Sequence, residues 1–282
     1  MRIANVRGRL TLLTDNGGVD VEKASKGRFG ADPQSVFAQW ATFRAWAASA
    51  GPDAAVPVAE ADLGSPAPRP TQVFGIGLNY RDHAAESGLP LPTSPATFTK
   101  FPTCITGPFA EVELPSACVD WEVELVVVIG PRAYRVADGD AWNHVAGLTV
   151  GQDVSERIVQ WAGGGQFSLG KSFPGFGPMG PCLVTPDALK NPDDLELGCS
   201  INGEQVQTSR TSDMVFSVPR IIAELSAILP LLPGDVIFTG TPAGIGATRK
   251  PPRFLQPGEV LSSYVEGIGT LRNRFIAATT QG

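Results

Sequence analysis

The stretch VDWEVELVVVIG, residues 119–130, decides the fold of this sequence. It predicts a β-strand, because it ends in an apolar run from Leu125 to Ile129 that indicates burial on both faces. Yet the stretch also holds Glu122 and Glu124, which share one face because side chains two residues apart in a strand point the same way. An edge strand with a solvated face would explain two like charges. Burial would cost several kcal/mol for each unpaired carboxylate, so a positive group is expected against them.

A divalent cation would supply that positive charge. The segment GLTVGQDVSER (147–157) offers a third carboxylate, Asp153, at the end of an apolar strand and just before a helix that Ser155 could cap. Carboxylate oxygens suit Mg²⁺ or Mn²⁺, and Ca²⁺ could occupy the same ligands in a crystal. Three carboxylates leave coordination positions for a substrate and water. The alternative is that Asp153 only caps the helix or forms an Asx-turn.

Only two histidines are present. His83 lies in NYRDHAAES, three residues before Glu86, so the two share a face of a short helix and can form a general-base dyad. A Gly-rich turn precedes this helix and a Pro-rich loop follows it, which suits a mobile lid. The alternative is an ordinary surface pair. We interpret His144, in AWNHVAG, as structural.

Two further segments offer groups that bind anions. Lys171 stands among apolar and glycine residues in QFSLGKSF (166–173), where it can stabilise an anion or simply reach the surface. In GDVIFTGTPAGIG (234–246) a strand runs into a Gly-rich turn. The hydroxyls of Thr239 and Thr241 and the backbone around Gly240 can cradle a substrate carboxylate, or the turn can be a plain loop. No dinucleotide or phosphate-loop motif occurs.

The chain of 282 residues predicts a small N-terminal domain (1–68) and a catalytic domain (69–282), with a Pro-rich linker at 63–72. DNGG (15–18) and INGE (201–204) are hairpin turn signals. We expect helices within 32–49, 155–161 and 217–229. We expect strands at 96–100, 121–129, 145–152, 180–184, 195–201, 234–239 and 259–266. This pattern indicates an α+β fold that is mainly β and mostly antiparallel.

Composition excludes several classes of protein. A net charge of −6 disfavours nucleic acid and anionic membrane surfaces as partners. No apolar stretch reaches the roughly 18–20 residues that span a bilayer. The N-terminus reads as a first strand and not as a signal peptide, so we expect a cytoplasmic protein. Its four cysteines form no CxxC pair and are expected to be free thiols.

Five segments together resemble the fumarylacetoacetate hydrolase family over about residues 73–270: GLNYRDHAAE, DWEVELVVVIG, GLTVGQDVSER, GKSF and VIFTGTPAGIG. The resemblance implies a mixed β-sandwich roll, usually in a homodimer. It implies that Glu122, Glu124 and Asp153 bind a metal and that the His83–Glu86 dyad acts on water. It also implies that Arg157, Gln160 and Lys171 contact the substrate and that the Thr241 turn binds its carboxylate end.

Members of this family cleave acylpyruvates, decarboxylate oxaloacetate or isomerise related diacids. The dyad favours a hydrolase that breaks a C–C bond in a β-diketo acid, of acylpyruvate or fumarylpyruvate type, through a pyruvate enolate held at the metal. The alternatives are an oxaloacetate-type decarboxylase, an unsaturated dicarboxylate isomerase, and a non-enzymatic binding module stabilised by metal. A binding module would have no reason to place His83, Lys171 and Arg157 around the carboxylates. Two residues depart from the family pattern, Gln152 and Pro174.

Overall fold

The large β-sheet of the molecule has the predicted acidic strand at its centre. The computed structural model describes residues 1–49 and 55–278. Strand β10 (Val123–Ile129) lies between β11 (Val145–Gln152) and β16 (Val236–Phe238), and all seven of its residues are buried. Burial on both faces is therefore confirmed, and the edge-strand alternative for Glu122 and Glu124 is wrong.

In the described residues this sheet has eleven strands, in the order β3-β2-β1-β13-β11-β10-β16-β5-β6, with β4 beside β1 and β7 beside β13. The remaining strands of the sheet are β1 (Arg2–Val6), β2 (Arg9–Thr14), β3 (Gly17–Asp20), β4 (Leu63–Gly64), β5 (Val73–Gly77), β6 (Ala96–Thr99), β7 (Ile105–Thr106) and β13 (Gly177–Val184). Most pairs are antiparallel, but β5 runs parallel to β16.

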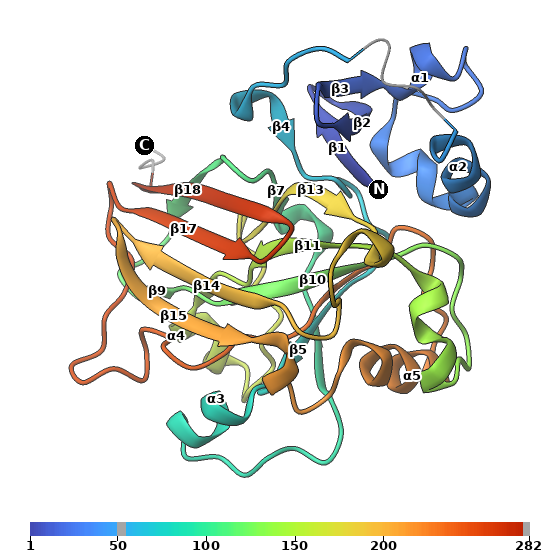
Figure 1. Ribbon diagram of the computed structural model, residues 1–282. Coiled ribbons are helices and arrows are strands. Elements are labelled where there is room, and N and C mark those ends of the chain that lie inside the picture. The colour runs from blue at the N-terminus through green and yellow to red at the C-terminus, as the bar shows by residue number, and fades with distance from the viewer. Residues whose placement is uncertain (50–54, 279–282) are drawn as a thin grey trace.

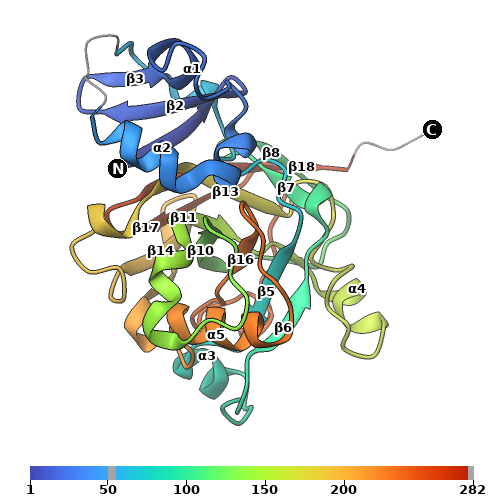
Figure 2. The same ribbon diagram turned by 90° about the vertical axis from the view of Figure 1, so that its right-hand side faces the viewer.

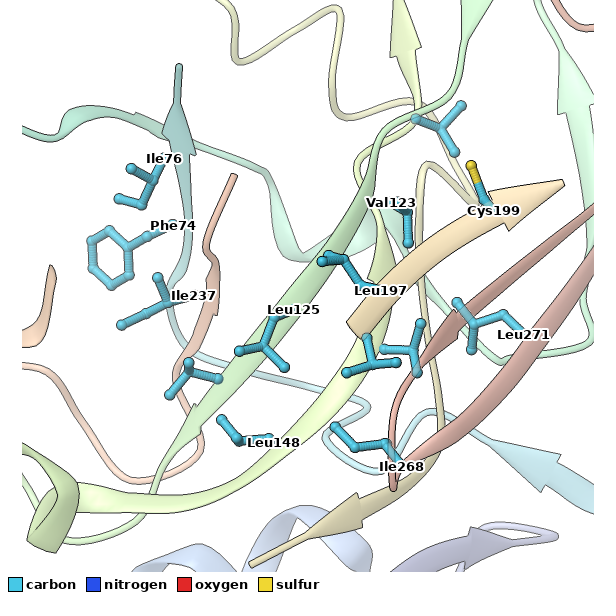
Figure 3. Packing of buried hydrophobic residues seen from close by; sticks show 14 of the residues in the cluster. Phe74, Ile76, Val123, Leu125, Leu148, Leu197, Cys199, Ile237, Ile268 and Leu271 are labelled. Carbon is cyan, nitrogen blue, oxygen red and sulfur yellow. The ribbon is translucent and has the colours of Figure 1, made fainter. Parts of the chain in front are cut away.

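A second sheet packs on one face of β10 and completes the expected β-sandwich. Its order is β15-β14-β17-β18-β8. Its strands are β8 (Glu111–Leu114), β14 (Glu196–Ile201), β15 (Glu204–Arg210), β17 (Val260–Val265) and β18 (Gly269–Ala277). Figure 3 shows Val123 and Leu125 of β10 beside Leu197 of β14, within one apolar cluster. A short pair, β9 (Val119–Asp120) and β12 (Ser155–Glu156), lies next to the site.

The N-terminal residues cover the opposite face of β10. Val126 and Val128 belong to a second apolar cluster that includes Phe37, Trp40 and Phe43. Strand β1 pairs with β13, so the large sheet continues into the N-terminal unit seen at the top of Figures 1 and 2. The expected boundary after residue 68 stays a prediction. The expected linker is wrong in part, because β4 pairs with β1.

Helices are few, as predicted, but the amphipathic helix expected within 32–49 is a 3₁₀ stretch (Pro33–Gln39) followed by a short α-helix (Trp40–Ala47). The α-helices are α1 (Val21–Ala24), α2 (Trp40–Ala47), α3 (Arg81–Glu86), α4 (Arg157–Ala162) and α5 (Val218–Ile228). The 3₁₀ turns are η1 (Pro33–Gln39), η2 (Glu60–Asp62), η3 (Pro102–Cys104), η4 (Asp138–His144), η5 (Pro186–Ala188) and η6 (Thr211–Asp213). Among the described helices, none is long and apolar enough to cross a membrane.

Helix α4 differs from its prediction at the N-terminus. It begins two residues late because Ser155 and Glu156 pair with β9 as strand β12. The capping side chain is Glu156, which accepts from the Val159 N–H at 2.6 Å. Ser155 instead donates its hydroxyl to the Asp153 carbonyl at 2.9 Å, so the expected Ser155 cap is wrong.

One end of the large sheet gathers every predicted site segment. The end of β11 leads to Asp153, the end of β16 leads to Thr239, and the end of β5 leads to α3, which carries His83. In both views α3 lies at the bottom, away from the N-terminal unit (Figures 1 and 2).

Candidate active site

The antiparallel pairing of β10 and β11 assembles the three carboxylates. Val123 pairs with Gln152, so Glu122 lies across from Asp153, and the Asp153 N–H donates to the Glu122 carbonyl at 2.9 Å. Glu124 follows two residues later on the same face. Carboxylate oxygens of Glu122, Glu124 and Asp153 all lie within 4.8 Å of one another, and all three residues are buried.

Two cations already neutralise Glu122. The Lys171 ammonium lies 2.6 Å from Glu122 Oε2 and 2.6 Å from Asp153 Oδ2. Arg157 Nη1 lies 2.8 Å from Glu122 Oε1. Burial raises the pKa of Glu122, but Lys171 and Arg157 outweigh that effect and lower the pKa to about 2. Glu122 is therefore ionised at neutral pH.

Glu124 lacks such a partner. Its one hydrogen bond among the described residues comes from the Gly240 N–H at 2.7 Å. Burial, together with the charges of Asp153 and Glu122, raises the pKa of Glu124 well above its ordinary value. A buried carboxylate of this kind must hold a proton or meet a cation. Three convergent carboxylates with one charge unmatched fit a hard divalent cation that takes oxygen ligands.

Lys100 is a further buried cation beside the carboxylates, and it was not predicted from the sequence. Its ammonium is fully buried and donates to Asp153 Oδ1 at 2.6 Å, to the Phe176 carbonyl at 3.2 Å and to the Lys171 carbonyl. The available signal was its place after β6, where Phe98 points inward, Thr99 points outward and Lys100 takes the next inward position.

The His83–Glu86 dyad is formed. His83 Nδ1 lies 3.3 Å from Glu86 Oε2, and His83 is 8% exposed. Glu86 also accepts from the Gly244 N–H at 3.1 Å and the Thr248 hydroxyl at 2.6 Å. Burial raises the pKa of Glu86, but the bonds from His83 and Thr248 outweigh it and lower the pKa. The ionised carboxylate thus fixes the ring and can stabilise its cationic form.

Helix α4 presents Arg157 and Gln160 on one face. Arg157 Nε and Nη2 donate to Asp120 Oδ2 at 2.9 and 2.7 Å, and Nη1 donates to Gln160 Oε1 at 2.9 Å. Asp120, which the sequence reading also missed, accepts from the N–H groups of Gly246 and Ala247 at 2.7 and 2.9 Å. Asp120 therefore positions Arg157 and links it to the Gly-rich turn.

The threonine turn lies beside β10, where it is held by backbone contacts. Thr239 donates its hydroxyl to the Leu125 carbonyl at 2.8 Å, and Thr241 donates to the Val123 carbonyl at 2.9 Å. Thr241 lines the cavity described below, whereas Thr239 and Gly240 do not. The structure gives Thr239 a role in holding the turn, and its expected contact with substrate stays a prediction.

A cavity of about 470 Å³ brings the predicted groups together. Its lining includes the three carboxylates and five other predicted residues: His83, Arg157, Gln160, Lys171 and Thr241. His144 lies outside it, as expected of a structural residue, with Nδ1 3.3 Å from the Pro131 carbonyl. A metal-stabilised binding module would have no need to gather a base and two cations here.

The two departures from the family pattern differ in their effect. Gln152 is buried, and its Oε1 accepts from the Glu122 N–H at 2.8 Å while its Nε2 donates to Ser263 at 2.8 Å. Its side chain thus fixes the backbone of a metal-site residue. Pro174 is exposed and does not line the cavity.

Two curated proteins are similar in sequence to most of this chain. The mitochondrial oxaloacetate tautomerase FAHD2A of Homo sapiens is 45% identical over 224 residues, which is 78% of this chain and 71% of that protein. The 2,4-didehydro-3-deoxy-L-rhamnonate hydrolase of Sphingomonas sp. (strain SKA58) is 43% identical over 239 residues, 83% of this chain and 84% of the relative.

Solved structures share the fold over 99% of this chain. A Mycobacterium smegmatis protein assigned as HpcE has a TM-score of 0.93 at 54% identity, with all of its chain covered. The maleylpyruvate hydrolase of Sphingobium sp. SYK-6, solved with manganese(II) and pyruvate, has a TM-score of 0.82 at 26% identity over its whole chain. Residues 72–276 match the family described as Fumarylacetoacetate (FAA) hydrolase C-terminal. The chain, which gathers three acidic residues in a buried cluster suited to a divalent metal, therefore belongs to the fumarylacetoacetate hydrolase family and shares its fold.

Proposed function

We propose that this protein is a divalent-metal-dependent hydrolase that cleaves a C–C bond in a β-diketo acid of the acylpyruvate type. The observation that carries the proposal is the His83–Glu86 dyad, because His83 lines the same cavity as the three carboxylates and Glu86 holds its ring. A fixed imidazole beside an ionised carboxylate is what general-base activation of water requires. The maleylpyruvate hydrolase among the structural neighbours adds support.

Each step of the proposed reaction depends on particular residues of this chain. A Mg²⁺ or Mn²⁺ ion bound by Glu122, Glu124 and Asp153 would supply Lewis-acid stabilisation of the charge that develops on a 2-oxo acid. His83 takes a proton from water as the water oxygen bonds to the distal carbonyl carbon. The C–C bond then breaks, its electron pair passes to the methylene carbon, and the proton held by His83 returns to that carbon and completes pyruvate. The other product is the acyl carboxylic acid.

Lys171 and Gln160 would stabilise negative oxygen atoms during this step. Both line the cavity, and Lys171 is a buried ammonium between two carboxylates. Burial lowers the pKa of Lys171, but Asp153 and Glu122 outweigh it and raise the pKa, so Lys171 stays charged. Fixed positive charge in a site that excludes water is effective at stabilising a developing oxyanion.

A second candidate is the interconversion of the keto and enol forms of oxaloacetate. The name of the human relative at 45% identity, an oxaloacetate tautomerase, favours it. His83 would then move a proton between the methylene carbon and the carbonyl oxygen, with no water added and no C–C bond broken. A decarboxylase would form the pyruvate enolate without adding water, and an unsaturated dicarboxylate isomerase would form the dienolate of its own substrate.

Product analysis separates these reactions. Metal-stripped protein is incubated with acetylpyruvate and, separately, with oxaloacetate, each with and without Mg²⁺. The proposal expects pyruvate and acetate from acetylpyruvate, only with metal. Pyruvate and CO₂ from oxaloacetate alone would indicate a decarboxylase. A change in the enol absorbance of oxaloacetate with no mass change would indicate the tautomerase.

Replacing the base tests the assigned role of His83. The His83→Ala variant is expected to lose at least about 100-fold in kcat, the usual scale for a general base. Its Mg²⁺ affinity, measured by calorimetry, should stay within about threefold of wild type, because His83 is not a proposed ligand. His144→Ala is the matched control and should retain both properties. Loss of metal binding in His83→Ala would overturn the role assignment.

A further inference from the structure

The outer part of the cavity bears on which acyl group the enzyme accepts. We propose that this group is uncharged and apolar, and that an aromatic wall formed by Phe98, Phe167 and Trp161 selects it. This inference rests on the proposed function, because it names the substrate class of the same site. It favours acylpyruvates with an aliphatic or aryl acyl group over diacids.

The aromatic wall runs from the carboxylate cluster to the surface. The Lys171 ammonium lies 5.1 Å from the centre of the Phe98 ring, so the wall begins beside the proposed metal site. Phe98 meets Phe167 edge to face with ring centres 5.8 Å apart, and Phe167 meets Trp161 with ring centres 4.9 Å apart. Phe98 is buried and Trp161 is 59% exposed. A group attached to the reacting carbon would follow these rings outward.

The backbone around the wall is adapted to it. A Cβ atom at Gly75 would lie 2.3 Å from the Phe98 ring, so only glycine leaves room for the buried ring on the β5–β6 pair. On α4, Arg157 and Trp161 are four residues apart and share a face. The same helix thus places a polar anchor at its start and an apolar contact at its end.

Other apolar side chains complete the lining of the cavity. Ile76 and Ile245 line it, and Leu89 lines it while remaining 53% exposed. Large apolar side chains that face solvent around a cavity mark a surface that a ligand covers. An apolar acyl group would bury Leu89, Phe167 and Trp161 together.

Charge disfavours a second carboxylate in this part of the cavity. Apart from His83, the described cationic side chains that line the cavity are Arg157 and Lys171. Arg157 already pairs with Asp120 and Glu122, and Lys171 pairs with Glu122 and Asp153. A carboxylate placed against the rings would lose its hydration without gaining a cation.

A pair of substrates matched in shape tests the proposal directly. In 4-methylpentanoylpyruvate an isopropyl group stands where succinylpyruvate has a carboxylate. With the metal-loaded enzyme we expect kcat/KM to be at least 30-fold higher for 4-methylpentanoylpyruvate. Across acetyl-, butanoyl- and hexanoylpyruvate we expect kcat/KM to rise about fourfold for each methylene buried against the wall.

Two variants test whether the aromatic wall causes this substrate preference. Phe167→Ala should reduce the hexanoyl-to-acetyl ratio of kcat/KM by about tenfold, on the scale of a hydrophobic specificity contact. Leu169→Ala is the matched control, since Leu169 is 64% exposed in the same loop and does not line the cavity. It should leave the ratio unchanged. Thermal unfolding of both variants checks that each is folded.

The outcomes keep the two proposals separate. If no acylpyruvate is cleaved, the proposed function fails. If acylpyruvates are cleaved but succinylpyruvate equals or exceeds its apolar partner, the selection for an apolar group fails and the hydrolase stands. An unchanged ratio in Phe167→Ala, with the substrate preference intact, would overturn the role of the wall.

Discussion

Oppositely charged side chains alternate through the centre of the site, each in contact with the next, and the successive nitrogen–oxygen distances are 2.6–2.8 Å. The order is Asp120, Arg157, Glu122, Lys171, Asp153 and Lys100. Three carboxylates and three cations balance, so the row carries no formal net charge. Glu124 stands outside the row, and its burial together with the charges of Asp153 and Glu122 raises its pKa.

Lys100 ends this row, and its loss should be costly. Lys100→Met removes one partner of a buried ion pair and leaves Asp153 less compensated, at a cost of about 3–5 kcal/mol. Urea unfolding of the metal-free protein would measure the loss. Adding Asp153→Asn to Lys100→Met should recover part of it. Lys190→Met, at an exposed lysine, is the control. Equal stability of Lys100→Met and wild type would contradict the buried contact.

Glu124 should make the stability of the metal-free protein depend on pH. A carboxyl whose pKa is raised on folding stabilises the fold below its unfolded pKa and loses that contribution as pH rises through the folded value. The uncharged amide of Glu124→Gln cannot ionise, so this variant does not lose that stability as pH rises. The Tm of Glu124→Gln minus that of wild type, measured in EDTA, should therefore increase from pH 4 to pH 8. Glu111→Gln, at an exposed residue, should show no such trend.

At the scale of elements, the Gly-rich turn at 244–248 connects two parts of the site. Gly244 and Thr248 bond to Glu86, whereas Gly246 and Ala247 bond to Asp120. Glu86 orients His83, and Asp120 orients Arg157. One turn therefore positions both the base and the arginine.

Substitution of Gly246 tests this connection between the base and the arginine. A Cβ atom there would lie 1.9 Å from the Arg253 carbonyl oxygen and 2.7 Å from Asp120 Oδ1, so the backbone would have to move. Gly246→Ala should destabilise the protein by about 1–3 kcal/mol, the usual cost of overpacking. It should also lower kcat/KM because Asp120 shifts. Gly139→Ala, where a Cβ atom meets nothing within 4 Å, is the control for both measurements.

Local patterns in the sequence were sufficient to predict most elements. The strand expected at 145–152 matches β11, and the helix expected at 217–229 matches α5 within one residue at each end. The INGE turn joins β14 to β15, with Asn202 at φ 49° and Gly203 at φ 90°. The hairpin at Arg7 and Gly8 was missed, because its turn has only one glycine and no Asn or Asp.

The sequence was sufficient to predict those site residues whose side-chain type itself indicates a chemical role. The carboxylates, His83, Lys171 and Arg157 all reach one cavity as expected. Lys100, Asp120 and Gln207 were not predicted, because their contacts depend on tertiary pairing. Gln207, for example, accepts from the Val123 N–H at 2.9 Å and donates to Thr241 at 2.9 Å, 34 residues away.

At the scale of the molecule, the N-terminal unit supports the catalytic sheet. Its aromatic side chains cover Val126 and Val128, and β1 completes the edge of β13. A chain reduced to residues 69–282 should therefore expose this face and unfold with low cooperativity in urea. The full chain is the control. A sharp unfolding transition in the shorter chain would show that the predicted boundary separates two independent domains.

The homodimer expected from the family resemblance stays a prediction. Sedimentation equilibrium should give about twice the 29.6 kDa of one chain. The expected cytoplasmic location also stays a prediction. A mass of one chain at micromolar concentration would contradict the dimer.

The Gly-rich turn and the aromatic wall have separate roles, and this separation affects how the substrate range of the enzyme can evolve. The turn at 244–248 is shared by the base and the arginine, so most alterations there should impair both at once. Trp161 and Phe167 lie on a separate segment that holds none of the proposed metal ligands. Mutation of that segment can alter which acyl groups are accepted without changing the base or the proposed metal ligands. Laboratory evolution toward new acylpyruvates should therefore find its improved variants at 161–169 and keep 244–248 constant.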